Sequence, residues 1–289
     1  MSFAIVTDSS ANLPNEIIDQ YGIEIASLVF RVEDRVYLSY EKGQDNDLKR
    51  FYTMMRNKED VKTSCIEAAR CKELFERLLD QGQDVLYLGF SSALSATYQV
   101  AQMVLEQLRP KYPHRKIYHV DTLAASLGEG LLVLHAARQR EQGKSIEEVY
   151  NWQLDNRLRL CHWFTVEDLF FLKRGGRVSA ATAVLGTMLG IKPVLHVDNE
   201  GRLINVAKAR GRKNSLDALV KHMEETVENP AEQTICISHG DCIEDAQYVA
   251  EQVQEKIGVK DVVIHYVDPV VGAHSGPGTV ALFFLGSRR

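Results

Sequence analysis

The stretch DVLYLGFSSALSATYQVAQMVL, Asp84 to Leu105, runs from a short apolar segment through a hydroxyl-rich one into a segment with helical spacing. An apolar run of this length, followed directly by a helix, is typical of a strand buried in a parallel sheet. In such folds ligands bind where strands end, beside helix N-termini whose free N–H groups favour an anion. The hydroxyls here belong to Ser91, Ser92, Ser95 and Thr97. They predict an anion-binding loop, with a plain helix cap by Ser92 or Ser95 as the alternative.

Strand-like and helix-like segments alternate along the rest of the chain, which indicates an α/β architecture with right-handed crossovers. The first strand is expected in SFAIVTDSS, and the helix after it between Pro14 and Gly22. Near residue 160 the pattern becomes richer in strands and glycines. We therefore expect an N-terminal α/β domain over residues 1–160 and a C-terminal α/β domain over residues 161–289.

Several local patterns add detail to this architecture. Residues 23–32 are β-branched and apolar, and they predict a single strand. Residues 198–211 have the turn formers of a hairpin. Thr63 and Ser64 come just before a helical pattern, with Glu67 three residues after Ser64, as in a capping box.

Composition and charge exclude some classes of protein. The chain has 289 residues and a net charge of −5, whereas binding of nucleic-acid phosphates normally needs a basic surface. No apolar run approaches the roughly 18 residues of a membrane span. The N-terminus enters a strand-like run without a charged leader, which predicts a cytoplasmic protein.

The five cysteines are an odd number without a C-x-x-C pair, which argues against a disulfide framework. In the segment CISHGDC, Cys236, His239 and Cys242 follow one another at three-residue intervals, a spacing compatible with three zinc ligands. A structural zinc site, however, needs four ligands. We expect instead that Cys236 lies in a buried strand and Cys242 at the start of a helix, with no metal bound.

Three further segments carry side chains suited to an anion. TDSSANLP offers Asp8, Ser9 and Ser10 after the first strand. GAHSGPGTV is expected to form a loop that surrounds His274 with glycines, which let the backbone approach a ligand closely. LKRGGRVS places Arg177 beside two glycines, either as a fork for a carboxylate or phosphate or as part of a solvated turn.

A hydrolase is the alternative from a different class of protein. One of the loop serines, His274, and Asp8 or Asp121 would supply its nucleophile, base and acid. The G-x-S-x-G elbow of such enzymes does not occur, and GFSSALS does not have its spacing. The binding interpretation is therefore preferred.

Taken together, these segments resemble the DegV family, including the fatty-acid-binding subunits of bacterial fatty acid kinase. The resemblance spans nearly the whole chain in the expected order. It implies a two-domain fold, with a Rossmann-like parallel sheet in the N-terminal domain, a mixed sheet in the C-terminal domain and one long-chain fatty acid between them. The matching segments are IVTDSSANLP, Thr63–Ser64, SSALSATYQ, VDTLAASLGEG, LKRGGRVS, GIKPVLHVDNEGRL, ARGRKNSLDAL and GAHSGPGTV.

The resemblance also implies how such a protein works. The binding subunit does no chemistry by itself and needs no cofactor. A separate ATP-dependent kinase subunit phosphorylates the bound carboxylate, and the acyl phosphate serves phospholipid synthesis, so a transient contact with a membrane surface is compatible with this role. A lipid-sensing regulator without a kinase is the nearest alternative.

Carried over residue by residue, the resemblance implies a set of carboxylate-binding positions. Thr63, Ser92 and Ser95 would bind the carboxylate, next to Ala96, and His274 and Arg177 would support them. Arg210 and Arg212 would lie on the surface that meets the kinase. Further supporting positions are Asp8, Ser9, Ser64, Ser91 and Gly276.

Two positions depart from the family pattern. Cys65 is followed by Ile66 and Glu67, where the usual TSxPS has a proline and a serine, and Ala96 replaces a glycine. Ala96 requires an ordinary backbone conformation and narrows the room near the head group. Residues 179–195, SAATAVLGTMLGIKPVL, are expected either to line the acyl tunnel or to form an ordinary buried helix.

Overall fold

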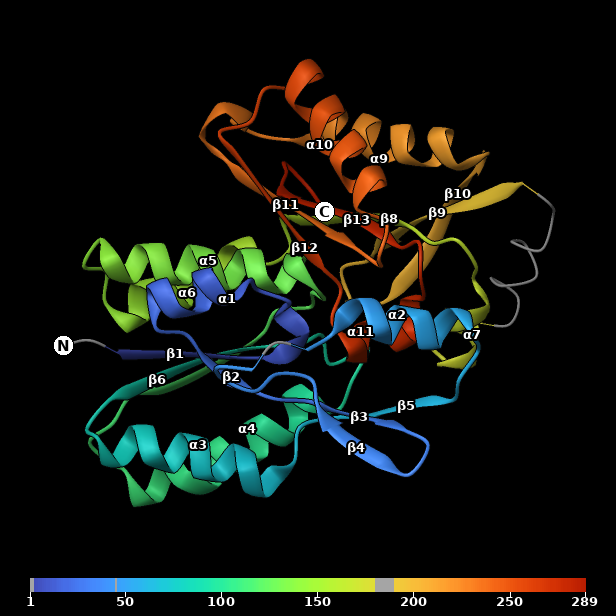
Figure 1. Cartoon of the computed structure of the whole chain (residues 1–289). Helices are drawn as coiled ribbons and strands as arrows, with labels where there is room; N and C mark the ends of the chain where they lie inside the picture. The colour runs from blue at the N-terminus through green and yellow to red at the C-terminus, as the bar shows by residue number, and fades with distance from the viewer. Residues whose placement is uncertain (1–2, 45, 180–189) are drawn as a thin grey trace.

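The computed structural model describes residues 3–44, 46–179 and 190–289, and the N-terminal half is built on a four-stranded parallel sheet (Figure 1). Its strand order is β2-β1-β6-β7. The helices α3 and α4 cover one face, and α1, α5 and α6 lie on the other (Figure 1). The strands are β1 (Phe3–Asp8), β2 (Glu24–Ala26), β6 (Asp84–Gly89) and β7 (Ile117–Asp121). The helices are α1 (Asn15–Tyr21), α3 (Ala68–Asp80), α4 (Thr97–Leu108), α5 (Leu127–Glu141) and α6 (Ile146–Asn156).

The C-terminal half has a six-stranded mixed sheet in the order β10-β9-β8-β13-β11-β12, in which only β11 and β12 pair in parallel. This arrangement confirms the predicted α/β fold class and the predicted hairpin, which is β9–β10. The helices α9 (Arg212–Thr226) and α10 (Ile243–Lys256) cover its outer face. The strands are β8 (Leu160–Thr165), β9 (Ile191–Val197), β10 (Leu203–Arg210), β11 (Thr234–His239), β12 (Asp261–Tyr266) and β13 (Val280–Leu285).

A third, three-stranded antiparallel sheet corrects the prediction of one strand over residues 23–32. The chain turns at Ser27 and Leu28, because the Leu28 N–H donates to Ser9 Oγ and the Tyr40 N–H to Ser27 Oγ. Residues after the turn join the small sheet, in the order β4-β3-β5. Its elements are β3 (Val29–Val32), β4 (Arg35–Leu38) and β5 (Val61–Ser64), with α2 (Leu48–Arg56) between β4 and β5.

The predicted capping box at Ser64 is also wrong. Ser64 ends strand β5, and α3 begins at Ala68 after Glu67, whose side chain caps nothing and pairs with Arg70 instead. Thr63 and Ser64 are therefore strand residues. The remaining short elements are α7 (Phe170–Arg174), α11 (Pro269–Ser275) and three 3-10 turns, Ser9–Ala11, Arg109–Lys111 and Pro230–Glu232.

The helix α5 lies between the two large sheets and is buried along most of its length. It packs against β1 and β6 of one sheet and against β8, β11 and β13 of the other. Buried leucines at 127, 131, 132 and 134 explain this position, because each stabilises the fold by about 1.5–3 kcal/mol when removed from water. None of the helices in the described residues is both long and apolar enough to cross a membrane.

One carboxyl group lies in this core, on the first turn of α5. Glu129 is fully buried, and its oxygens lie 2.9 Å from Thr7 Oγ1 and 2.8 Å from Ser10 Oγ. Ser10 Oγ also contacts the Asp8 carboxylate, so this hydroxyl lies between two carboxyl groups. Its single proton can be donated to only one of them. Burial raises the pKa of Asp8 as well, but Asp8 accepts further hydrogen bonds from Tyr87 OH and the Phe90 N–H, which favour its charged form. Burial, and then the charge of Asp8, raise the pKa of Glu129 well above its ordinary value, so Glu129 is the protonated partner.

Replacing Glu129 by Gln is expected to flatten the dependence of stability on pH. In the native protein the pKa of Glu129 is raised above its ordinary value of 4.5, so unfolding releases a proton. The contribution of this group is full below pH 4.5 and is lost as the pH rises through the native pKa. Urea unfolding at a series of pH values should show a slope reduced by up to about 1.4 kcal/mol per pH unit in Glu129→Gln. Glu141→Gln, an exposed change in the same helix, should keep the wild-type slope; equal slopes in all three proteins would contradict the assignment.

Candidate functional site

A cavity of about 260 Å³ lies between the two halves of the chain. Most of its wall is apolar and comes from β8, β9, β10 and β13 of the six-stranded sheet, from the segment after β6 and from α11. One end of the cavity is polar, and the apolar remainder of the wall would shield a bound hydrocarbon chain from water. The apolar lining includes Leu28, Phe90, Leu94, Phe164, Val197, Leu203, Val270 and Phe283.

The polar end brings together four side chains that the sequence singled out. Thr63 comes from β5, Ser95 from the segment before α4, Arg177 from the turn after α7, and His274 from α11. Thr63 Oγ1 lies 2.8 Å from His274 Nε2. Ser64 and Ala96 line the same end. A hydroxyl, an imidazole and a guanidinium at one end of an apolar cavity are suited to a carboxylate.

His274 lies in the last turn of α11 and not, as the sequence suggested, in a loop. The Asp268 carboxylate caps the start of this helix, accepting the N–H groups of Val270 and Val271, and Gly276 ends it at φ 80°. The ring of His274 rests directly on Gly175, where a Cβ atom would come within 2.0 Å of Nδ1. Burial, then the nearby Arg177 and Arg174, lower the pKa of His274 to about 4. The imidazole is therefore neutral near pH 7 and serves as a hydrogen-bonding group.

Arg177 is the cation of the site. Its Nε donates to the Leu94 carbonyl at 3.1 Å, and Nη1 donates to the Gly175 carbonyl. Among the described residues no carboxylate forms an ion pair with it. Burial lowers the pKa of the guanidinium, because a charge removed from water needs a counter-charge. An anion bound in the cavity would supply it.

The hydroxyl-rich loop separates into residues that line the cavity and residues that hold the loop. The helix α4 begins at Thr97, and its N-cap residue is Ala96, so neither Ser92 nor Ser95 occupies the N-cap position. Ser95 Oγ still accepts the N–H of Thr97, the first helical residue, at 3.2 Å, and Ser95 lines the cavity. Ala96 has φ −73° and ψ 0°, the ordinary conformation that its side chain requires.

Two of the predicted loop serines do not line the cavity. Ser91 Oγ donates to the Gly201 carbonyl at 2.9 Å and so ties the loop to the β9–β10 hairpin. The Ser92 N–H donates to Asp121 Oδ1, and its hydroxyl lies outside the cavity wall. Ser92 is therefore not among the side chains that the structure brings together at the polar end.

Asp8 and Ser9 do not line the cavity but hold residues that do. Asp8 accepts the Phe90 N–H at 3.0 Å and so fixes the start of the hydroxyl-rich loop. Ser9 Oγ accepts the Leu28 N–H and holds the turn that places Leu28 in the wall. Gly276 does not line the cavity; the Phe171 ring occupies the space that a side chain there would need.

Sequence reasoning missed several wall residues. Ser275 lies next to His274 inside the quoted GAHSGPGTV segment, so its position gave a usable signal. Its buried hydroxyl lines the cavity and has no hydrogen-bond partner in the described part of the chain. His162 and Ser126 also line the cavity. Ser126 lies inside the quoted VDTLAASLGEG segment, whereas no motif marked His162, because its placement depends on how β8 and α5 face each other.

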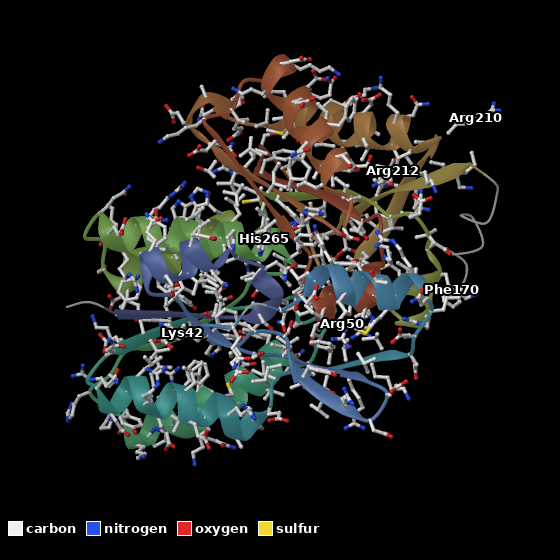
Figure 2. All side chains as sticks on the ribbon, in the orientation of Figure 1. Lys42, Arg50, Phe170, Arg210, Arg212 and His265 are labelled. Carbon is white, nitrogen blue, oxygen red and sulfur yellow. The ribbon has the colours of Figure 1, made fainter. Side chains whose placement is uncertain are left out.

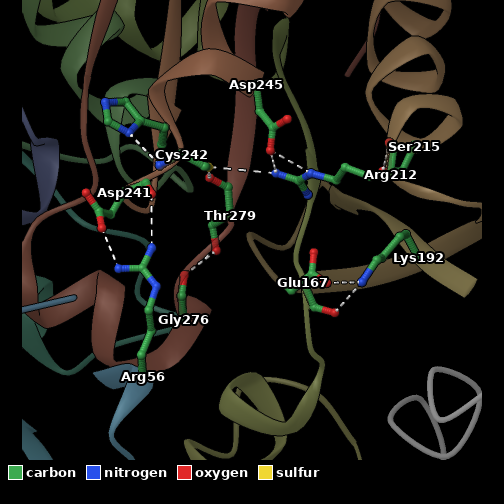
Figure 3. A network of polar contacts seen from close by, with 11 residues as sticks. Arg56, Glu167, Lys192, Arg212, Ser215, Asp241, Cys242, Asp245, Gly276 and Thr279 are labelled. Carbon is green, nitrogen blue, oxygen red and sulfur yellow. Dashed lines mark hydrogen bonds and ion pairs between the residues drawn. The ribbon is translucent and has the colours of Figure 1, made fainter. Parts of the chain in front are cut away.

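The two arginines expected on a partner surface differ in their surroundings. Arg210 is exposed at the end of β10 (Figure 2). Arg212 is half-buried and pairs with Asp245, with Nε 2.8 Å and Nη2 2.7 Å from Oδ2, and it also reaches Cys242 Sγ (Figure 3). Arg210 is therefore the freer of the two for a contact with another molecule.

The alternative chemistries of the sequence are not assembled at this site. Cys236 lies in β11, and Cys242 caps α10 as expected, with its N–H donating to His239 Nδ1. Within the described ranges no three His, Cys, Asp or Glu side chains converge on a metal position. The hydrolase triad lacks an acid that contacts His274, because His274 Nδ1 has no hydrogen-bond partner among the described residues. Asp121 accepts the N–H groups of Ser92 and Leu123 instead. Asp8 accepts hydrogen bonds from Tyr87 OH and the Phe90 N–H.

Comparison with known proteins agrees with this geometry. A family model described as "Uncharacterised protein, DegV family COG1307" matches residues 2–287. A DegV domain-containing protein of Clostridium perfringens is 45% identical over 289 residues, covering 99% of this chain and 98% of that protein. A DegV domain-containing protein of Lactococcus lactis is 36% identical over 289 residues, covering 100% and 99%.

Solved structures are similar over the same length. The DegV family protein from Thermus thermophilus, described by its fatty acid binding, has a TM-score of 0.88 at 28% identity, covering 99% of this chain and 100% of that one. DegV from Bacillus subtilis, described as a fatty acid binding protein, has a TM-score of 0.85 at 26% identity, again covering 99% and 100%. The resemblance inferred from the sequence motifs is confirmed, and the chain belongs to the DegV family.

Proposed function

We propose that this protein binds one long-chain fatty acid in the cavity between its two sheets, with the carboxylate at Thr63, Ser95, Arg177 and His274. The observation that carries the proposal is Arg177, a half-buried cation without a carboxylate partner in the described chain, at the polar end of an apolar cavity. The fatty acid binding described for the Thermus thermophilus and Bacillus subtilis relatives supports it.

The two parts of the cavity contribute differently to binding. Burial of some fifteen methylenes, at about 0.8 kcal/mol each, gives a large favourable free energy of binding before the cost of ordering the chain is subtracted. A helix terminus adds only about 0.3–1 kcal/mol to carboxylate binding, and each hydrogen bond to the charged carboxylate about 1.5–3 kcal/mol. The apolar wall therefore supplies most of the affinity, and the polar end fixes which way the fatty acid points.

Purified protein is expected to carry a fatty acid. Mass spectrometry after denaturation should find close to one molecule per chain, with roughly 14–20 carbons if the methylene term dominates. Delipidated protein should bind added fatty acid again. Protein that is free of lipid and also fails to bind added fatty acid would contradict the proposal.

Ser95 and Ser92 provide a matched pair of substitutions. Ser95→Ala removes a hydroxyl that faces the cavity, and loss of a hydrogen bond to a charged group costs about 1.5–3 kcal/mol, or roughly 10–100-fold in affinity. Ser92→Ala removes a hydroxyl outside the cavity wall and should bind fatty acid like the wild type. Dissociation constants of the delipidated proteins test this. Equal affinities for Ser95→Ala and Ser92→Ala would remove Ser95 from the site.

We propose further that the protein presents the carboxylate to an ATP-dependent kinase partner. A carboxylate oxygen would attack the γ-phosphorus of ATP, the bond to the bridging oxygen would break, and ADP would leave, giving an acyl phosphate. The polar end suits this role because Ala96, in its wall, is exposed to solvent. The exposed Arg210 is a candidate contact for the partner.

Reversal of the charge at Arg210 tests this second step. Arg210→Glu should lower kinase-dependent acyl phosphate formation about tenfold or more, because like charges across an interface are costly, while fatty acid binding stays unchanged. Lys260→Glu, an exposed change before β12 at the opposite edge of the sheet, is the control and should leave both unchanged. If the wild-type protein neither captures the candidate kinase subunit nor supports acyl phosphate formation, the lipid-sensing alternative replaces this step.

A further inference from the structure

The apolar wall of the cavity contains a histidine that the binding of an unsubstituted hydrocarbon does not explain. His162, on β8, lines the cavity and is only 1% exposed. Neither of its ring nitrogens has a hydrogen-bond partner in the part of the chain that the structure describes. The Leu160 carbonyl favours the protonated ring but forms no hydrogen bond of acceptable geometry with it.

The surroundings of His162 are built to hold the ring in place. Its edge packs against the face of Phe283, with ring centroids 5.4 Å apart at 88°. Gly128 makes room for it, since a Cβ atom there would come within 2.4 Å of Nε2. Ser126, two residues earlier, is also buried in the cavity wall, 2.8 Å from Ser238 Oγ and 2.7 Å from Asn12 Oδ1. We call His162 and Ser126 the inner polar patch.

The inner polar patch comes from other elements than the carboxylate end. His274 lies at the end of α11, close in the chain to the start of β13 at Val280. His162 pairs with Phe283, three residues further along that strand, which is about 10 Å at 3.3 Å per residue. With its carboxylate at Thr63 and His274, a bound fatty acid would therefore bring its hydrocarbon chain to His162.

An unsubstituted hydrocarbon leaves this imidazole unsatisfied. Burial holds the pKa of His162 well below its ordinary value, so the ring is neutral, with one N–H donor and one acceptor nitrogen. A buried polar group without a partner destabilises the complex in which it occurs. A hydroxyl is both donor and acceptor, so it can pair with the ring in either tautomer, and sites built around such a pairing discriminate against ligands that lack the hydroxyl.

We propose that the fatty acid selected by this cavity carries a hydroxyl group on its chain, held at the inner polar patch. The inference rests on the proposed function, because it concerns the ligand of the same cavity. It assigns His162 as the residue that determines specificity, apart from the carboxylate ligands.

The test is a set of dissociation constants measured on delipidated full-length protein. The ligands are octadecanoic acid and a series of octadecanoic acids with one hydroxyl at successive chain positions. We expect one position, or two neighbouring ones, to bind about tenfold or more tighter than octadecanoic acid. In His162→Leu this ratio should fall to about one, whereas His162→Gln, whose amide keeps a donor and an acceptor, should retain part of it.

The outcomes separate this inference from the proposed function. Tight binding of octadecanoic acid with no preferred hydroxyl position would overturn the inference and leave fatty acid binding standing. Failure to bind any of the ligands would overturn both. The wild-type series decides the question by itself if His162→Leu does not fold, and a preference that survives in a folded His162→Leu would remove His162 as its cause.

Discussion

The buried carboxylate of Asp8 is the point on which the site depends. It stands at the end of β1 and accepts hydrogen bonds from Ser10, Tyr87 and the Phe90 N–H, so it joins the carboxyl ends of β1 and β6. This arrangement is compatible with an apolar core because the neighbouring carboxyl, Glu129, is held neutral. Because the Glu129 carboxyl keeps its proton, α5 can lie buried between the two large sheets. Because Asp8 accepts the Phe90 N–H, the hydroxyl-rich loop starts from a fixed position.

The fold then divides recognition between its two halves. The N-terminal half supplies Thr63 and Ser95, and the segments after β8 supply Arg177 and His274. Neither half contains all four of these side chains, and the apolar wall likewise draws on both. A ligand in this cavity would touch both halves at once, which links its binding to their relative position and explains why the polar residues are so far apart in the sequence.

The sequence was informative where chemistry is local. Alternating segments predicted the α/β fold, and turn formers predicted the β9–β10 hairpin. The glycines around His274 singled it out in the sequence, and the structure places it in the cavity wall. Patterns failed where long-range contacts decide: the turn at Leu28 depends on Ser9, and β-propensity alone cannot show that residues 23–32 divide between two sheets. Ser92 and Ser95 look equivalent in the chain, yet only Ser95 faces the cavity. His162 could not be found, because its role depends on which face of β8 meets α5. The predicted tunnel segment, residues 179–195, lies largely outside the described residues.

A crystal structure of the protein with a bound fatty acid would show where the carboxylate lies. One carboxylate oxygen is expected within hydrogen-bond distance of Thr63 Oγ1 or Ser95 Oγ, with the Arg177 guanidinium as the nearest cation and the hydrocarbon running past Phe283. A fatty acid bound in the reverse direction, or with its carboxylate outside the cavity, would contradict this expectation.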